Sequence, residues 1–122
     1  MSRVIKFTQN GEWIESQGKV RKVGLSLQNA QELGEVTFIS DASLGKSVKQ
    51  GEPILSLEAS KAAFDLYAPL DGIIRGINPA VLNNLGLLNS DPYGQGWLIE
   101  LEVTGGDESV LQVVTVEDTT IT

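Results

Sequence analysis

The chain has 122 residues, of which 41% are hydrophobic, and its formal net charge is −7 with a pI of about 4.4. This length and composition predict one soluble globular domain, spanning residues 1–122, with its own hydrophobic core. The acidic balance argues against a nucleic-acid partner, because proteins bind phosphates through clustered Lys and Arg. No stretch approaches the roughly 18 apolar residues of a membrane span, and the N-terminus lacks the apolar region of a signal peptide, so we expect a cytoplasmic protein.

The chain contains no Cys and no His. It therefore has no disulfide, no thiolate nucleophile and no metal site built on Cys or His. A Ser/His/Asp triad is excluded by count, so acid–base chemistry would fall to carboxylates, Tyr or Lys. A phosphate-binding Gly-rich loop is also missing, because Gly45–Lys46–Ser47 is preceded by Ser40 where that motif requires glycine. These absences argue against a stand-alone enzyme and against a resident metal ion.

Alternating apolar and polar residues, separated by turn pairs such as Asn10–Gly11 and Asp71–Gly72, predict a mainly β protein. The expected strands lie near Val4–Phe7, Glu12–Ser16, Lys19–Gly24, Gly34–Ile39, Ile54–Glu58, Phe64–Tyr67, Ile73–Ile77 and Trp97–Val103.

Two short helices are expected among these strands. Ser26 is the predicted N-cap of the segment SLQNAQELG, whose apolar residues follow helical spacing until Gly34 ends it. Asn78 is the predicted N-cap of NPAVLNN, in which Pro79 occupies the first helical position. The last stretch, LQVVTVEDTTIT, is expected to form a strand or an ordered tail. We therefore place the core of the domain at residues 12–103 and a C-terminal tail at 104–122.

A weak internal repeat indicates how the strands are arranged. The pair GEVTFI and GEPILSLE resembles the pair DGIIRGI and GWLIELE, and each pair reads as a strand, a loop and a second strand. A hairpin at Lys61 joins the two halves. We therefore expect two small sheets folded over each other, with Lys61 on the turn at their junction.

The stretch SLEASKAAFDLYAPLDG, residues 56–72, places Lys61 among the small residues Ala59, Ser60, Ala62 and Ala63. A lysine in a polar loop is usually an ordinary solvated side chain. Here the small neighbours would let another protein's active site reach the ammonium group, and the turn would present it. A prosthetic group in amide linkage to Lys61 would be a tether that reaches several partners, and it would supply chemistry that the chain lacks.

The segment LEASKAAFDLYAPLDG resembles the lipoyl-attachment hairpin of the H protein of the glycine cleavage system. Three further segments are similar to the same family: VGLSLQNAQELGEVTFI, VKQGEPILSLEASKA and NSDPYGQGWLIELE. Biotin carriers share the fold but usually flank their lysine with Met, which occurs here only at position 1. The resemblance implies a barrel-sandwich hybrid, the lipoyl/biotinyl-type fold, with short added helices.

The same resemblance implies roles for four residues. Lys61 would carry the lipoyl group, and Glu58 would be recognised with it by the lipoyl-attaching enzyme. Glu12 would lie near the cleft that shelters the loaded arm, and Asp65 would help to present the hairpin. Read without the resemblance, Glu58 and Glu12 are polar strand residues that face solvent. The resemblance implies a carrier that is not itself an enzyme, and we expect it to be a monomer. Its implied partners are a lipoate ligase or lipoyl transferase and a dihydrolipoyl dehydrogenase.

The chain departs from typical family members in several places. It has Gly11 where they have His, Asn29 where they often have His or Tyr, and Glu-Ala-Ser-Lys where they have Glu-Ser-Val-Lys. These departures favour a lipoate-binding protein of heterodisulfide-reductase-like sulfur oxidation, whose arm would carry sulfur between partner enzymes. The alternative is an aminomethyl carrier that works with glycine decarboxylase and aminomethyltransferase. A second alternative is an interaction module whose Lys61 stays unmodified.

Overall fold

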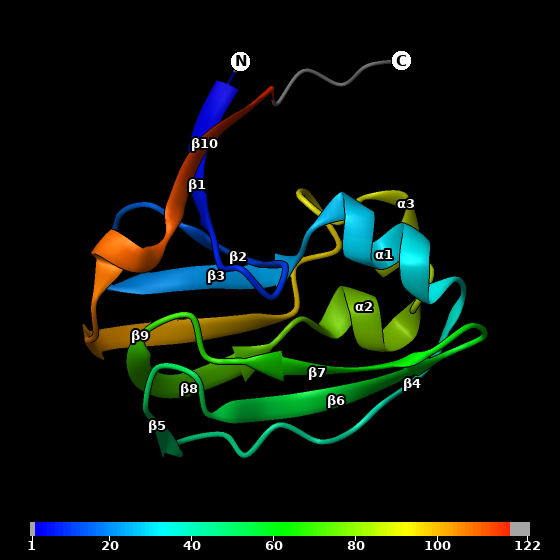
Figure 1. Cartoon of the computed structure of the whole chain (residues 1–122). Helices are drawn as coiled ribbons and strands as arrows, with labels where there is room; N and C mark the ends of the chain where they lie inside the picture. The colour runs from blue at the N-terminus through cyan, green and yellow to red at the C-terminus, as the bar shows by residue number, and fades with distance from the viewer. Residues whose placement is uncertain (1, 118–122) are drawn as a thin grey trace.

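The computed structural model describes residues 2–117, which form ten strands in two antiparallel sheets, with short helices along one side (Figure 1). The strands are β1 (Ser2–Phe7), β2 (Glu12–Glu15), β3 (Val20–Leu25), β4 (Val36–Ile39), β5 (Ser47–Val48), β6 (Pro53–Ala59), β7 (Ala63–Tyr67), β8 (Asp71–Ile77), β9 (Ile99–Gly105) and β10 (Gln112–Glu117). The helices are α1 (Leu27–Leu33), α2 (Pro79–Asn83) and α3 (Leu87–Ser90), and a 3₁₀ turn, η1, spans Glu108–Val110. The mainly β prediction is confirmed. Within residues 2–117, no helix has the length and apolar character to span a membrane.

The two sheets divide the strands in the way that the internal repeat predicts. The small sheet has the order β4–β6–β7, and the large sheet has the order β10–β1–β2–β3–β9–β8–β5. The strands of the first repeat unit, β4 and β6, pair in the small sheet, and those of the second, β8 and β9, pair in the large one. Both strands of the Lys61 hairpin, β6 and β7, belong to the small sheet. The expectation that this hairpin lies at the junction of the two sheets is therefore wrong, because the chain passes from the hairpin to the large sheet only after β7, at residues 68–70.

The hydrophobic core lies between the sheets and combines residues from both. Leu57 and Leu66 of the small sheet and Ile74 and Leu101 of the large sheet are each exposed by 1% or less. Side chains alternate between the two faces of a strand, so each sheet has one buried face and one outer face. Full burial of each such side chain stabilises the fold by about 1.5–3 kcal/mol.

Both predicted helix starts are confirmed. Ser26 and Asn78 each accept a hydrogen bond from a backbone N–H group in the first turn of their helices. Asn78 is also 3% exposed, and its amide donates to the carbonyl groups of Gln95 and Trp97. This cap therefore also fixes the loop that leads into β9.

Other elements differ from the expectation. The strand expected at Gly34–Ile39 begins at Val36, because Gly34 has a φ of +75°, outside the strand region. Two further elements, β5 and α3, were not predicted, since segments of two to four residues are too short to show a hydrophobic period.

The C-terminal segment expected as a strand or ordered tail forms β10, and its residues 118–122 lie outside the described residues. β10 pairs with β1 along the whole of both strands. Just before it, the carboxylate of Glu108 lies 2.6 Å from Lys6 Nζ and 3.2 Å from Arg21 Nη1. These ion pairs join η1 to β1 and β3, so they fix the start of the C-terminal segment to the large sheet.

This cluster predicts a pH dependence of stability. The hydrogen bond from Lys6, together with that from Arg21, lowers the pKa of Glu108 from its ordinary value of 4.5. A lowered pKa in the folded state contributes stability that is present above the ordinary pKa and is lost as the pH falls through the folded-state value. Since the Glu108 side chain is 38% exposed, solvent screening keeps this contribution to about 1 kcal/mol.

We therefore predict that Glu108→Gln lowers the free energy of unfolding by about 1 kcal/mol at neutral pH, and that the difference from wild type shrinks as the pH falls below 4.5. Urea denaturation at neutral and acidic pH measures both values. Glu32→Gln, which changes an exposed carboxylate outside these ion pairs, is the control and should show little difference at either pH. An equal loss for Glu108→Gln at both pH values would contradict the stabilising role of its charge.

Candidate functional site

The turn between β6 and β7 lies beside the end of α1 (Figure 1). Lys61 is the middle residue of this turn, residues 60–62. The turn is fixed to that end of the helix by backbone hydrogen bonds. The N–H of Lys61 donates to the carbonyl of Leu33 at 3.0 Å, and the N–H of Ser60 donates to the carbonyl of Glu35 at 2.9 Å. In return, the N–H of Glu35 donates to Ser60 Oγ at 3.0 Å.

These bonds fix the backbone of Lys61, and the first carbons of its side chain lie close to Gly34. The last carbonyl groups of a helix have no partner within the helix, and the hairpin turn supplies one through the Lys61 N–H. The Lys61 residue itself is exposed, and among residues 2–117 no carboxylate lies within ion-pair distance of its Nζ. An approaching enzyme therefore meets an open ammonium group on a positioned backbone.

Gly34 makes the close approach of hairpin and helix geometrically feasible. Its φ of +75° lies in the region that favours glycine. A Cβ at this position would lie 2.5 Å from Ser60 Oγ and 3.1 Å from Lys61 Cγ. Asn89 on α3 holds the same junction, because its Nδ2 donates to the Gly34 carbonyl at 2.6 Å. A side chain at position 34 would therefore displace the Ser60 and Lys61 side chains from the end of α1.

Glu58 and Asp65 lie on the outer face of the same hairpin. Both are exposed, Glu58 is paired with Ala63, and Asp65 is paired with Ser56. Paired residues and residues two apart share a face, so the two carboxylates lie on one side of the sheet, opposite the core-facing Leu57. The structure thus brings Glu58 and Asp65 onto the face that leads to Lys61, and their functional roles remain predictions.

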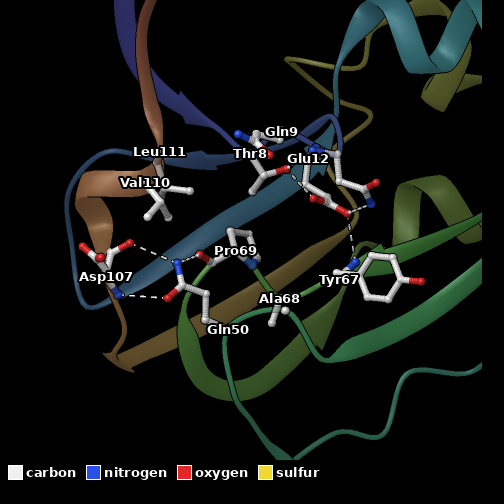
Figure 2. A pocket seen from close by; sticks show the side chains of 12 residues that line it. Thr8, Gln9, Glu12, Gln50, Tyr67, Ala68, Pro69, Asp107, Val110 and Leu111 are labelled. Carbon is white, nitrogen blue, oxygen red and sulfur yellow. Dashed lines mark hydrogen bonds between the residues drawn. The ribbon is translucent and has the colours of Figure 1, made fainter.

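Glu12 lies apart from Lys61 and does not face solvent. It is 1% exposed and accepts hydrogen bonds from Thr8 Oγ1, Asn10 Nδ2 and the backbone N–H of Tyr67 (Figure 2). The reading of Glu12 as a solvent-facing strand residue is therefore wrong. Because Tyr67 ends β7 and Lys61 precedes it, a strand of about 13 Å separates the Glu12 carboxylate from the hairpin turn.

A groove with a volume of about 630 Å³ lies beside Glu12 and Tyr67 and extends to Val110 near the C-terminal strand (Figure 2). The side-chain amide of Gln50 holds that far wall. It accepts from the N–H of Asp107 and donates to the carbonyl of Asp107, both at 3.0 Å. The groove therefore has apolar surface at one end and lies against the buried, oriented carboxylate of Glu12 at the other.

The two departures from typical family members that lie near Glu12 contact each other. Gly11 has a φ of +93°, and a Cβ added there would overlap the side-chain amide of Asn29. Asn29 Nδ2 donates to the carbonyl of Asn10 at 2.8 Å. The Asn29 amide thus fills the space that a side chain at position 11 would need. The two departures form one packing arrangement and are not independent of each other.

Comparison with known proteins identifies the family of this chain. The family model described as "Glycine cleavage H-protein" matches residues 5–121. The chain belongs to the glycine cleavage H-protein family. Members of this family carry a lipoyl group bound covalently to a lysine, and they serve as carriers while partner enzymes perform the catalysis. The exposed lysine between small residues fits such a group, because no ion pair within the described part of the chain engages its nitrogen.

Individual relatives agree with this assignment. The glycine cleavage system H protein of Thermotoga maritima is 38% identical, over 88% of this chain and 85% of that protein. That of Herpetosiphon aurantiacus is 37% identical, over 91% and 86%. The crystal structure of a glycine cleavage system H protein from Mycobacterium marinum has a TM-score of 0.80 and 29% identity, covering 88% of each chain. The resemblance and the barrel-sandwich fold expected from it are confirmed.

Three residues that position the site were not recognised from the sequence. Gly34 was expected only as the end of a helix and the start of a strand, and no role was expected for Asn89 at the hairpin turn or for Gln50 at the groove. Asn89 reaches Gly34 across 55 positions of the chain, and Gln50 reaches Asp107 across 57. No local pattern predicts such contacts, because each depends on how distant segments pack.

We predict that Gly34→Ala lowers the free energy of unfolding by about 2–4 kcal/mol, because it combines a strained positive φ with a clash against the hairpin turn. Gly45→Ala is the matched control: its φ is +84°, and nothing lies within 4 Å of a Cβ added there. It should lose only about 1–2 kcal/mol, the conformational part. Urea denaturation of the two variants measures the difference. Equal losses would show that packing against the turn contributes nothing to stability.

Proposed function

We propose that this chain carries its lipoyl group on Lys61 and uses it to carry an aminomethyl group in the glycine cleavage system. The observation that carries the proposal is the presentation of Lys61. Its backbone is bonded to the end of α1, and its side chain is exposed among small residues. A lysine held in this way offers its nitrogen to an attaching enzyme without a change in the fold.

Attachment requires a reaction at Lys61 Nζ. The ammonium group loses a proton, and the nitrogen then attacks the carboxyl carbon of lipoate that ATP has activated as an adenylate. An amide C–N bond forms, the bond to the phosphate oxygen breaks, and AMP leaves. We assign Glu58 to recognition by the lipoate ligase or lipoyl transferase, and Asp65 to presentation of the hairpin, because both lie exposed on the face next to the turn.

We assign Glu12 to the shelter of the carried group. The three donors on its carboxylate hold both oxygens in place at one end of the groove. A cationic amine in the groove would lie near a buried negative charge that is already oriented, so little reorganisation would be needed. When bound, the lipoyl group supplies the sulfur chemistry that a chain without Cys lacks. The proposed partners are glycine decarboxylase, aminomethyltransferase and dihydrolipoyl dehydrogenase. We propose that the chain meets them in the cytoplasm as a monomer.

The relatives favour the aminomethyl carrier over the sulfur carrier that the departures in the sequence first indicated. Relatives that match over most of the chain are named glycine cleavage system H proteins, and the comparisons offer no support for sulfur transfer. The sulfur carrier was favoured because the chain departs from typical family members at several positions. The departures at Gly11 and Asn29 form one packing arrangement, so they count as one change and favour the sulfur carrier less strongly.

We predict that incubation with a lipoate ligase, lipoate and ATP adds one lipoyl group to the wild-type chain and none to Lys61→Arg, as measured by intact mass. Lys49→Arg, which alters another exposed lysine, should accept the group like wild type. The modified wild type should then support glycine-dependent release of CO₂ by a glycine decarboxylase, whereas Lys61→Arg should not.

Two results would contradict this prediction in different ways. Absence of modification under conditions that modify a known carrier would favour the unmodified interaction module. Modification without glycine-dependent CO₂ release, together with loading of sulfane sulfur by heterodisulfide-reductase-like proteins, would restore the sulfur-transfer function.

A further inference from the structure

Phe38 on β4 is 52% exposed, and a bulge in the strand turns it outward. In a regular strand Phe38 would share the inward face of Val36, two residues earlier, which is 3% exposed. The pairing of β4 with β6 shifts register between Val36 and Phe38. This shift places Phe38 on the outer face and lets Ile39 pack against the core. Bulges frequently re-aim a side chain next to a functional site.

The outward ring lies on the face that leads to Lys61. Phe38 is paired directly with Glu58, and the neighbouring Thr37 hydroxyl donates to the Glu58 carbonyl at 3.2 Å. Glu58 is in turn paired with Ala63, two residues after Lys61. A hollow of about 580 Å³ on the hairpin is lined by Glu58, Lys61 and Asp65. An aromatic ring, two carboxylates and the candidate attachment lysine therefore share one small surface.

We propose that Phe38 is a docking residue for the enzyme that acylates Lys61. Its ring enters an apolar pocket of that enzyme, and basic side chains at the rim of the pocket meet Glu58 and Asp65. The inference rests on the proposed function, because it presupposes that Lys61 is modified. It adds an apolar contact through the Phe38 ring to the charged recognition proposed for Glu58.

The position of the surface selects the attaching enzyme among the partners of a carrier. That enzyme reacts with Lys61 Nζ itself, so its active site has to close around the hairpin turn and its neighbours. Enzymes that act on a carried group meet the far end of a long arm and need not touch residues beside the lysine. Charge agrees with this choice, since the chain carries a net charge of −7 and complementary charges steer association.

The ring is the part of this surface with the largest apolar area to bury on docking. Aromatic anchors that enter pockets commonly dominate binding, while charges at the rim mainly affect association rate and specificity. We therefore expect the loss of the ring to raise the KM for the carrier and to leave kcat nearly unchanged.

The test measures initial rates of lipoylation with a lipoate ligase, lipoate and ATP, at varied concentrations of the carrier. Phe38→Thr removes the ring and keeps a residue that favours strands. It should raise KM about tenfold. Leu82→Thr is the matched control, because Leu82 on α2 is also 52% exposed and lies outside this surface. It should behave like wild type.

A pair of charged variants separates docking from stability. Phe38→Glu places like charges opposite each other in the strand pair with Glu58, so a purely structural effect would make it the worse variant. Phe38→Lys would pair well with Glu58 but would meet the basic rim of the enzyme. Docking therefore predicts the higher KM for Phe38→Lys, and the opposite order would overturn the proposal.

Further outcomes are equally decisive. If Phe38→Thr has the same KM as the wild type and Lys61→Arg still accepts no lipoyl group, the docking role is overturned and the proposed function stands. Failure to modify the wild type would remove both. If the wild type is a dimer and Phe38→Thr is a monomer, the face around Phe38 binds a second copy of the chain, and the inference is overturned.

Discussion

The hydrogen bonds between the hairpin turn and the end of α1 are the constraint on which the presentation of Lys61 depends. The end of a helix leaves carbonyl groups without partners, and a hairpin turn leaves N–H groups without partners. Here the N–H of Lys61 donates to the carbonyl of Leu33, and Ser60 and Glu35 are joined by two further hydrogen bonds. The helix has only seven residues, so it depends on such tertiary contacts for its own stability. This contact fixes the backbone of Lys61, while the residue as a whole stays exposed.

Hydrogen bonds between distant segments also fix the Glu12 carboxylate. A buried carboxylate is costly unless hydrogen bonds compensate for its lost hydration. In this chain the compensation comes from neutral donors on the β1–β2 loop and from the backbone of β7. The carboxylate therefore ties the large sheet to the hairpin strand that leads back to Lys61. Its burial makes it part of the fold as well as of the groove.

Local patterns in the sequence predicted much of the fold and one residue of the site. Period-two alternation identified most strands, and Ser26 and Asn78 identified the helix starts, because these features depend on a few neighbouring residues. The small residues around Lys61 predicted an exposed turn. The burial of Glu12 and the outward turn of Phe38 were not predicted, since both depend on how strands from different parts of the chain meet. The bulge in β4 reverses the very alternation on which strand prediction relies.

The most direct test of this account is hydrogen exchange at the hairpin turn, followed residue by residue by NMR. If the turn is bonded to α1, the amides of Ser60 and Lys61 should exchange at least about a hundredfold more slowly than in an unstructured peptide. Their protection should also fall in Gly34→Ala while the central strands stay protected. Exchange of these two amides at nearly unstructured rates in the wild type, with β6 and β7 protected, would contradict the claim that the helix positions Lys61.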